Sequence, residues 1–312
     1  MGLRIDSEKN CQLCPRMCGV DRIAGQVGFC GATSQLRISR AALHFWEEPP
    51  ISGEAGSGTI FFSSCSLRCV FCQNYAISRG QAGKVVSVSR LAKIMLELQD
   101  QGALNINLVT PMHYAPQICE AVGLAKAHGL ELPIVCNTGG YERPEVVRLM
   151  GDVVDIWLTD FKYASQSLAK ELSYAGDYPQ AAASSLKEMV RLIDEHGGVK
   201  KRDDGSLAQG IIVRHLVLPG HTQDSCDVLD KVFEIAGNNI DVSIMNQYTP
   251  NKQCLESGTS LGRKLREAEY DKVLTYAEDL GFNKIWWQEQ GTASESFIPE
   301  FDTTGVEGPE LS

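Results

Sequence analysis

The chain has 312 residues, of which 43% are hydrophobic and 22% charged, and its 29 Lys and Arg against 39 Asp and Glu give a formal net charge of −10. This composition allows a large core and excludes disordered and fibrous proteins. The negative charge repels phosphate groups, so we expect neither nucleic acid nor an anionic membrane as a partner. No apolar run is long enough to cross a membrane and residues 1–6 resemble no signal peptide, which predicts a soluble, cytoplasmic protein.

The N-terminal region, residues 1–50, is predicted to be a small Cys-rich metal-binding extension. Seven of the eleven cysteines lie in the first 72 residues, and clustered thiols in a reducing compartment are more often metal ligands than disulfides. The first four, Cys11, Cys14, Cys18 and Cys30, have the spacing C-x2-C-x3-C-x11-C. Four thiolates can hold either a zinc ion or a second iron–sulfur cluster, and the spacing does not choose between them.

From residue 59 onward, short apolar runs alternate with amphipathic helical patterns, which predicts an α/β fold with a parallel sheet. The expected strands are Thr59–Ser63, Ile106–Val109, Pro133–Cys136, Asp155–Thr159, Ile211–Val217 and Val242–Met245. The expected helices are Ser89–Gln101, Gln117–His128, Ala181–His196, Asp224–Ala236 and Arg266–Leu280.

Residue types at the ends of these segments refine the prediction. Ser89 is expected to cap its helix, Gly129 to end the next one, and residues 197–210 to form a polar loop. An open doubly wound sheet and a partial barrel both fit residues 51–290, and either places ligands at the carboxyl ends of the strands. Residues 291–312 are expected to be a loose acidic tail.

A second group of cysteines follows the first expected strand directly. Cys65, Cys69 and Cys72 form a C-x3-C-x2-C motif, with Phe71 before the last cysteine. Three thiolates can bind three irons of a cubane cluster and leave the fourth iron open to another ligand. A structural zinc site completed by a distant residue is the alternative.

This motif, its aromatic residue and its place after the first strand resemble the radical SAM superfamily. The resemblance implies a partial (β/α)6 barrel, a [4Fe–4S] cluster on Cys65, Cys69 and Cys72, and S-adenosylmethionine bound to the fourth iron. It also implies that reduction by a flavodoxin or ferredoxin-type donor splits this cofactor to a 5′-deoxyadenosyl radical, which abstracts hydrogen.

Other segments resemble the group that contains the pyruvate formate-lyase activating enzyme. By that resemblance Asp160 would hold a cation or a polar group of the cofactor, Lys162 its carboxylate and Arg214 its methionyl end, while Asn137 and Thr138 would lie near the ribose. Taken without the resemblance, an exposed Asp160–Lys162 pair and a structural Arg214 remain alternatives.

The chain departs from the superfamily after the second expected strand. Residues 109–114 replace the glycine-rich motif that binds the methionine amino group, so we expect the backbone carbonyl of Thr110 to take that role. His113 is a candidate hydrogen-bonding or acid–base group, with plain solvation as the alternative. His44, Glu47 and Glu48 either line the edge of the substrate or cluster site or form a polar crossing over the barrel.

The resemblance is dense over residues 11–74, where it matches homologues of the activating enzyme that carry an extra four-Cys motif. The predicted function is that of a radical SAM oxidoreductase, which activates a glycyl radical enzyme as its protein substrate. Modification of a peptide or a small molecule is one alternative. A non-catalytic zinc or iron–sulfur adaptor is the other.

Overall fold

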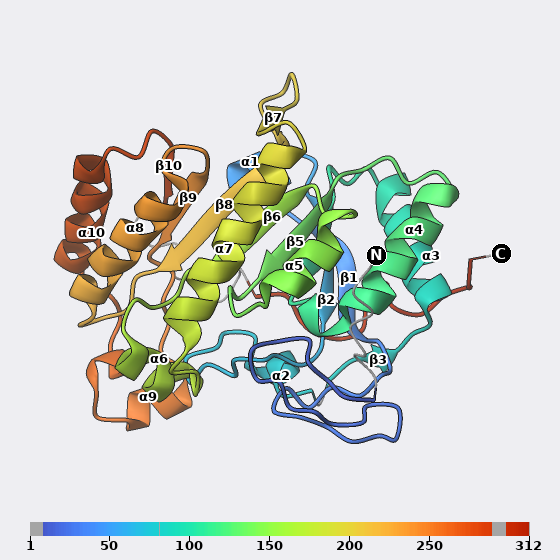
Figure 1. Ribbon diagram of the computed structural model, residues 1–312, viewed down its shortest axis with the longest axis horizontal. Helices are drawn as coiled ribbons and strands as arrows, with labels where there is room; N and C mark the ends of the chain where they lie inside the picture. Colours follow the sequence, from blue (N-terminus) through green and yellow to red (C-terminus); the bar gives the residue numbers. More distant parts are fainter. Residues whose placement is uncertain (1–8, 81, 289–297, 312) are drawn as a thin grey trace.

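A computed structural model describes residues 9–80, 82–288 and 298–311 (Figure 1). Its centre is a ten-stranded sheet with the order β10-β9-β8-β6-β5-β4-β2-β1-β3, and β7 pairs with β8. All neighbours from β2 to β10 in this order are parallel. These strands are β2 (Ser57–Phe62), β4 (Ile106–Val109), β5 (Ile134–Thr138), β6 (Ile156–Asp160), β8 (Leu207–Leu216), β9 (Asp241–Met245) and β10 (Ile285–Trp287). The expected α/β fold is confirmed, and each expected strand overlaps an observed one.

Helices cover the outer face of this sheet (Figure 1). The long ones are α3 (Val88–Asp100), α4 (Ala115–Ala127), α5 (Pro144–Gly151), α7 (Tyr178–Glu195), α8 (Thr222–Ala236) and α10 (Glu267–Leu280). The remaining helices on this side are α6 (Gln166–Ser173), which is as long as α5, and the short α2 (Tyr75–Ser78) and α9 (Lys252–Glu256). No helix of the described chain is both long and apolar enough to span a bilayer.

Two local expectations need correction. Ser87 caps α3, because its Oγ accepts a hydrogen bond from the Arg90 amide at 2.9 Å, whereas Ser89 lies inside the helix. Residues 197–210 form a hairpin and not a plain loop, since β7 (Lys200–Lys201) pairs antiparallel with the start of β8. Gly129 has φ +98° directly after the α4 cap, as expected for a glycine that ends a helix.

The extension is shorter than predicted. β1 (Arg37–His44) pairs antiparallel with β2 and with β3 (Lys84–Val85), so residues from 37 onward belong to the barrel sheet. The Cys-rich segment before β1 has no helix or strand among its described residues and lies beside α2 (Figure 1). Arg16 attaches it to the barrel by donating to the carbonyl oxygens of Ser66 and Ser173.

The opposite end of the barrel is closed by α1 (Pro49–Ser52), which lies at the amino ends of the parallel strands (Figure 1). Ile51 of this helix is fully buried against Val135, Ile156 and Ile212, which form the lower apolar layer of the barrel interior. Any cavity among the strands therefore opens toward their carboxyl ends.

The expected loose tail is wrong for residues 298–311, while 291–297 lie outside the described residues. Arg90 of α3 is 4% exposed and donates to the carbonyl oxygens of Val306, Glu307 and Pro309. Val306 is buried in the main core. The buried Arg90 guanidinium and backbone hydrogen bonds to Ser39 and Ala41 of β1 thus anchor the end of the chain, which the acidic composition of this segment did not reveal.

Candidate functional site

A cavity of about 530 Å³ lies at the carboxyl ends of the parallel strands. It brings together residues that the sequence predicted separately, from four different strand ends and the loop after β2. These lining residues are Cys65, Cys69, Cys72, Thr110, Asn137, Thr138, Asp160, Lys162 and Arg214. His113 is not among the described residues that line it.

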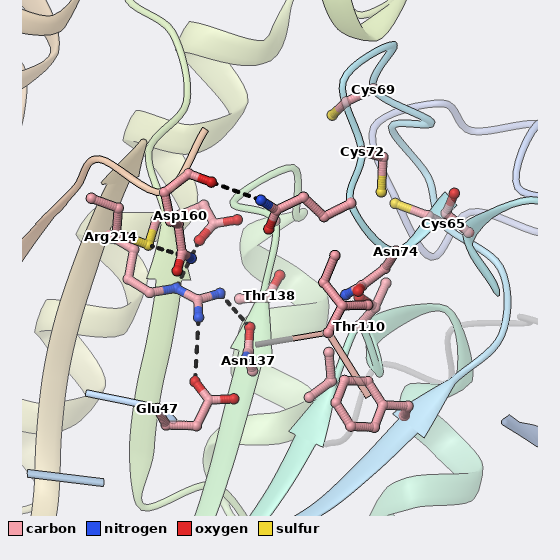
Figure 2. Close-up of a pocket in the computed structure, with 18 of the residues that line it drawn as sticks. Glu47, Cys65, Cys69, Cys72, Asn74, Thr110, Asn137, Thr138, Asp160 and Arg214 are labelled. Carbon is pink, nitrogen blue, oxygen red and sulfur yellow. Dashed lines mark hydrogen bonds and ion pairs between the residues drawn. The ribbon is translucent and has the colours of Figure 1, made fainter. Parts of the chain in front are cut away.

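The three cysteines lie on the loop between β2 and α2, where Figure 2 shows their thiols grouped on one side of the cavity. Ser64 and Arg68 both have positive φ, +85° and +54°, so the backbone turns sharply beside Cys65 and Cys69. The Leu67 amide donates to Cys65 Sγ at 3.4 Å, and the Ser173 hydroxyl donates to Cys69 Sγ at 2.9 Å. Such donors stabilise sulfur that carries negative charge.

Burial raises the pKa of the Cys65 thiol above its usual value and that of Cys72 to about 12. The thiols therefore keep their protons at neutral pH unless a cation replaces them. Among the described residues, no three His, Cys, Asp or Glu side chains converge closely enough to hold a single metal ion. In a cubane cluster each thiolate binds a different iron, so the three sulfur atoms can lie farther apart than the ligands of a single ion. The three cysteines therefore fit such a cluster.

A buried network of charges lies across the cavity from the cysteines. Asp160 accepts hydrogen bonds from Lys162 Nζ and, at 2.9 Å, from Arg214 Nε. Arg214 Nη2 donates to Asn137 Oδ1 at 2.6 Å (Figure 2). Burial acts to raise the pKa of Asp160, but the charges of Arg214 and Lys162 outweigh it and the pKa falls below its usual value. The network is ionised and paired, so the exposed Asp160–Lys162 pair considered above is excluded.

Thr110 follows β4 in a left-handed conformation with φ +57°. This conformation is strained for a β-branched residue. Its amide donates to the Asn137 carbonyl oxygen at 2.8 Å, which ties the β4 and β5 ends together. Thr110, whose carbonyl was expected to bind the methionine amino group, is therefore a residue of the cavity wall with a strained backbone.

His113 has a structural role beside the cysteine loop. It is 6% exposed, and its Nε2 lies 2.8 Å from the Ser63 carbonyl oxygen just before the cysteine loop. Burial lowers the pKa of His113 to about 3, so the ring is neutral. Its position does not fit the acid–base role that the sequence suggested.

Sequence reasoning missed Glu142, which lies between β5 and α5. It lines the cavity, is almost fully buried, and accepts a hydrogen bond from the Thr138 hydroxyl. Burial raises the pKa of Glu142 to about 7. In the sequence, Glu142 could have been recognised only as an acidic residue that follows the expected third strand closely. Glu47 and Glu48, for which two roles were open, both line the cavity.

The four N-terminal cysteines form a separate group outside this cavity. Burial first, and then the charges of the neighbouring thiols, raise the pKa of Cys14 and Cys30. Cys18 Sγ accepts from the Phe29 amide, and a Cβ on Gly28 would lie 2.7 Å from the same sulfur. The thiols are thus close enough to interact, and the backbone approaches one of them as only glycine permits.

Residues 51–183, which include the cysteine loop and most of the cavity wall, match the model of a 4Fe-4S single cluster domain. The fold resembles a radical SAM methyltransferase from Sphaerobacter thermophilus, with a TM-score of 0.50 and 10% identity over 74% of this chain and 66% of that one. Streptococcus suis SuiB, solved with its precursor peptide SuiA, gives a TM-score of 0.48 and 12% identity over 72% of this chain and 46% of SuiB. The chain thus spans less than half of SuiB and just under two thirds of the methyltransferase. The chain thus shares its fold with a radical SAM methyltransferase and contains a region that matches a 4Fe-4S single cluster domain.

One curated relative extends over nearly the whole chain. The uncharacterized protein MJ0674 of Methanocaldococcus jannaschii is 30% identical over 290 residues, which cover 89% of this chain and 77% of that protein. The chain belongs to the family of MJ0674.

Proposed function

We propose that the protein is a radical SAM enzyme that uses a [4Fe–4S] cluster on Cys65, Cys69 and Cys72. One observation carries the proposal: these thiols line the same cavity as the paired charges of Asp160 and Lys162. When bound, the cluster supplies one electron and S-adenosylmethionine supplies the 5′-deoxyadenosyl group that abstracts hydrogen. A zwitterionic methionyl group needs charges of both signs nearby, and the cavity offers them.

The chain's own residues bind and orient the cofactor. The Lys162 ammonium can pair with a carboxylate that approaches from the cavity, since among the described residues it bonds to Asp160 alone. Arg214 fixes Asp160 from the other side and holds Asn137 in place. These contacts keep Lys162 aimed at the cavity before the cofactor arrives.

The test is anaerobic reconstitution with iron and sulfide, followed by reduction with dithionite in the presence of S-adenosylmethionine. We expect an iron–sulfur absorbance and 5′-deoxyadenosine as a product. Cys72→Ala should lose both, because it removes one of the three iron ligands. Cys119→Ala is the matched control, since this half-buried thiol lies near Leu149 and away from the cavity. Cluster assembly without 5′-deoxyadenosine would contradict the proposal and favour an adaptor that only stores the cluster.

The family resemblance favours a protein substrate, and we propose that the enzyme generates a glycyl radical on a partner enzyme. A glycyl radical gives a doublet in the electron spin resonance spectrum of the partner. Modification of a peptide or a small molecule would instead leave a changed product, with deuterium carried from labelled substrate into 5′-deoxyadenosine. The same reaction mixture, examined by both measurements, separates these outcomes.

We further propose that Cys11, Cys14, Cys18 and Cys30 bind a second metal centre, either zinc or an iron–sulfur cluster. In the described chain no three of these thiols converge on a single metal ion, so zinc would require them to move closer together. Arg16 connects this segment to Ser66, which lies between two ligands of the first cluster, so a redox-active centre here would be well placed to pass electrons. A flavodoxin or ferredoxin-type protein is the proposed donor. Zinc, iron and sulfide analysis of wild type and Cys14→Ala decides the metal, and 5′-deoxyadenosine formation with reduced flavodoxin tests the donor.

A further inference from the structure

The floor of the cavity carries acidic side chains that the proposed cofactor contacts leave unused. Glu47 and Glu48 immediately precede α1, the helix that closes the amino end of the barrel, and both line the cavity. Figure 2 shows Glu47 below Arg214, on the side of the cavity away from the three cysteines. A group bound at this floor would reach toward the cysteine loop from below.

Positive charge at the floor is scarce. Arg214 Nη1 lies 3.5 Å from Glu47 Oε2, a long contact, while its Nε and Nη2 atoms are already bonded to Asp160 and Asn137. Glu48 Oε2 is buried and has no hydrogen-bond partner. Arg214 and Lys162 thus supply two positive charges for the three carboxylates of Asp160, Glu47 and Glu48, and at least one acceptor atom is left without a donor.

Asn107 gives an independent observation at the same place. It is 0% exposed, and neither its Nδ2 nor its Oδ1 has a hydrogen-bond partner. Its backbone lies opposite Val135, two residues before the pair of Val109 with Asn137, so its side chain points into the barrel as that of Asn137 does. The Asn107 amide faces the carboxylate of Glu47 and acts to lower its pKa, which burial nevertheless raises above its usual value, but the two groups do not meet the geometry of a hydrogen bond.

An unpaired amide in a barrel interior destabilises the fold unless something binds to it. Of the three unused atoms, Asn107 Nδ2 is a donor that has the Glu47 carboxylate beside it. Glu48 Oε2 and Asn107 Oδ1 are acceptors, so the partner still missing is a donor. An ammonium offers three N–H donors and a guanidinium five, each with the charge that the floor lacks.

We propose that this floor is a subsite for an ammonium or guanidinium group of the substrate. The alkyl chain of such a group would pass Phe61, Val109 and Met245, which line the cavity, and present a carbon toward the cysteine loop. The inference rests on the proposed function for the reaction at that carbon. The recognition of the cation stands by itself.

The test is calorimetric titration of the full-length, reconstituted protein with n-butylammonium and, as the neutral probe of equal length, 1-butanol. A buried charge-assisted contact predicts that n-butylammonium binds at least about 10-fold more tightly than 1-butanol. Titration with Nα-acetyl-lysine amide asks whether a side chain of a peptide is accepted as well as a free amine. Equal affinity for the amine and the alcohol, or no binding of either, would overturn the inference.

Two variants locate the contact. Glu48→Gln keeps the shape and removes the charge, so it should weaken n-butylammonium at least about 10-fold and leave 1-butanol unchanged. Glu54→Gln, at an exposed acid a few residues away, is the matched control and should change neither affinity. Unaltered amine binding in Glu48→Gln refutes the subsite.

The experiments distinguish a failure of the subsite from a failure of the proposed function. The 5′-deoxyadenosine assay is run on the same preparations without any amine. Amine binding with no 5′-deoxyadenosine would overturn the radical chemistry and keep the subsite, whereas the reverse pattern would overturn the subsite alone.

Discussion

Asp160 links the two cations of the cavity, and its replacement tests whether the charge network is organised as the structure shows. Its side chain is 14% exposed, and those of its partners Arg214 and Lys162 are 15% and 21% exposed. Asp160→Asn keeps the size of the side chain but leaves two largely buried cations without their shared anion. Breaking a buried pair from one side costs about 3–5 kcal/mol, so we expect the free energy of unfolding to fall by that amount.

The measurement is urea unfolding of the metal-free protein at pH 7, followed by circular dichroism. The control is Glu256→Gln, because the Lys252–Glu256 pair joins atoms 4.0 Å apart on side chains that are 90% and 67% exposed. A pair of that kind contributes at most about 0.5 kcal/mol. If Asp160→Asn cost no more than this control, Asp160 would not be the anion that holds Arg214 and Lys162.

The same variant predicts a pH dependence whose sign follows from the lowered pKa of Asp160. A carboxylate whose folded pKa lies below its unfolded value stabilises the fold at all pH values above the unfolded value, about 3.9. That stability is lost as the pH falls through the folded pKa. The difference between wild type and Asp160→Asn should therefore be constant from pH 7 to about pH 5 and shrink below pH 4.

Three further predictions concern other parts of the molecule. Gly28→Ala should lower the metal content of the N-terminal site alone, since its Cβ would lie 2.7 Å from Cys18 Sγ; Gly123→Ala, with nothing within 4 Å, should leave the metal content unchanged. Asn107→Leu should raise the free energy of unfolding by about 1–2 kcal/mol in urea, because it removes two unpaired polar atoms; a loss of stability would mean that the amide is satisfied. Glu142 has its pKa raised to about 7, so the folded protein holds a proton that the unfolded chain releases above about pH 4.3, and wild type should lose about 3 kcal/mol relative to Glu142→Gln between pH 4 and pH 8. Parallel pH profiles of the two proteins would contradict this.

The parallel strands from β2 to β9 were predictable because a strand buried on both faces is a short apolar run between turn residues, whereas the parallel edge strand β10 was not predicted. Ile106–Val109 agrees with β4 at both ends. The strands that escaped prediction lie at the edges of the sheet or pair antiparallel. β1 carries two arginines and only partly buried residues at its end, and β7 and β3 have two residues each. Their pairing depends on neighbours far away in the sequence, which no local pattern records.

The cysteine site was visible for the opposite reason, since its three candidate ligands lie within eight residues and their spacing alone indicates a metal or iron–sulfur site. The floor of the cavity has no such signature. Glu47, Asn107 and Arg214 come from three distant segments, and only the folded chain brings Glu47 within reach of both Asn107 and Arg214. Each by itself looks like an ordinary polar residue beside a strand.

This division follows from how a parallel barrel is built. The ligands of a cluster must lie at short distances from one another, and one tight loop can set those distances. Their spacing in the sequence is therefore enough to recognise them. A substrate is held by side chains from successive parallel strands, which are about 20–50 residues apart here and meet because strand ends align at one edge. Atoms left without partners after folding, such as those of Asn107 and Glu48, are therefore the better guide to what the barrel binds, whereas the motif is the guide to how it reacts.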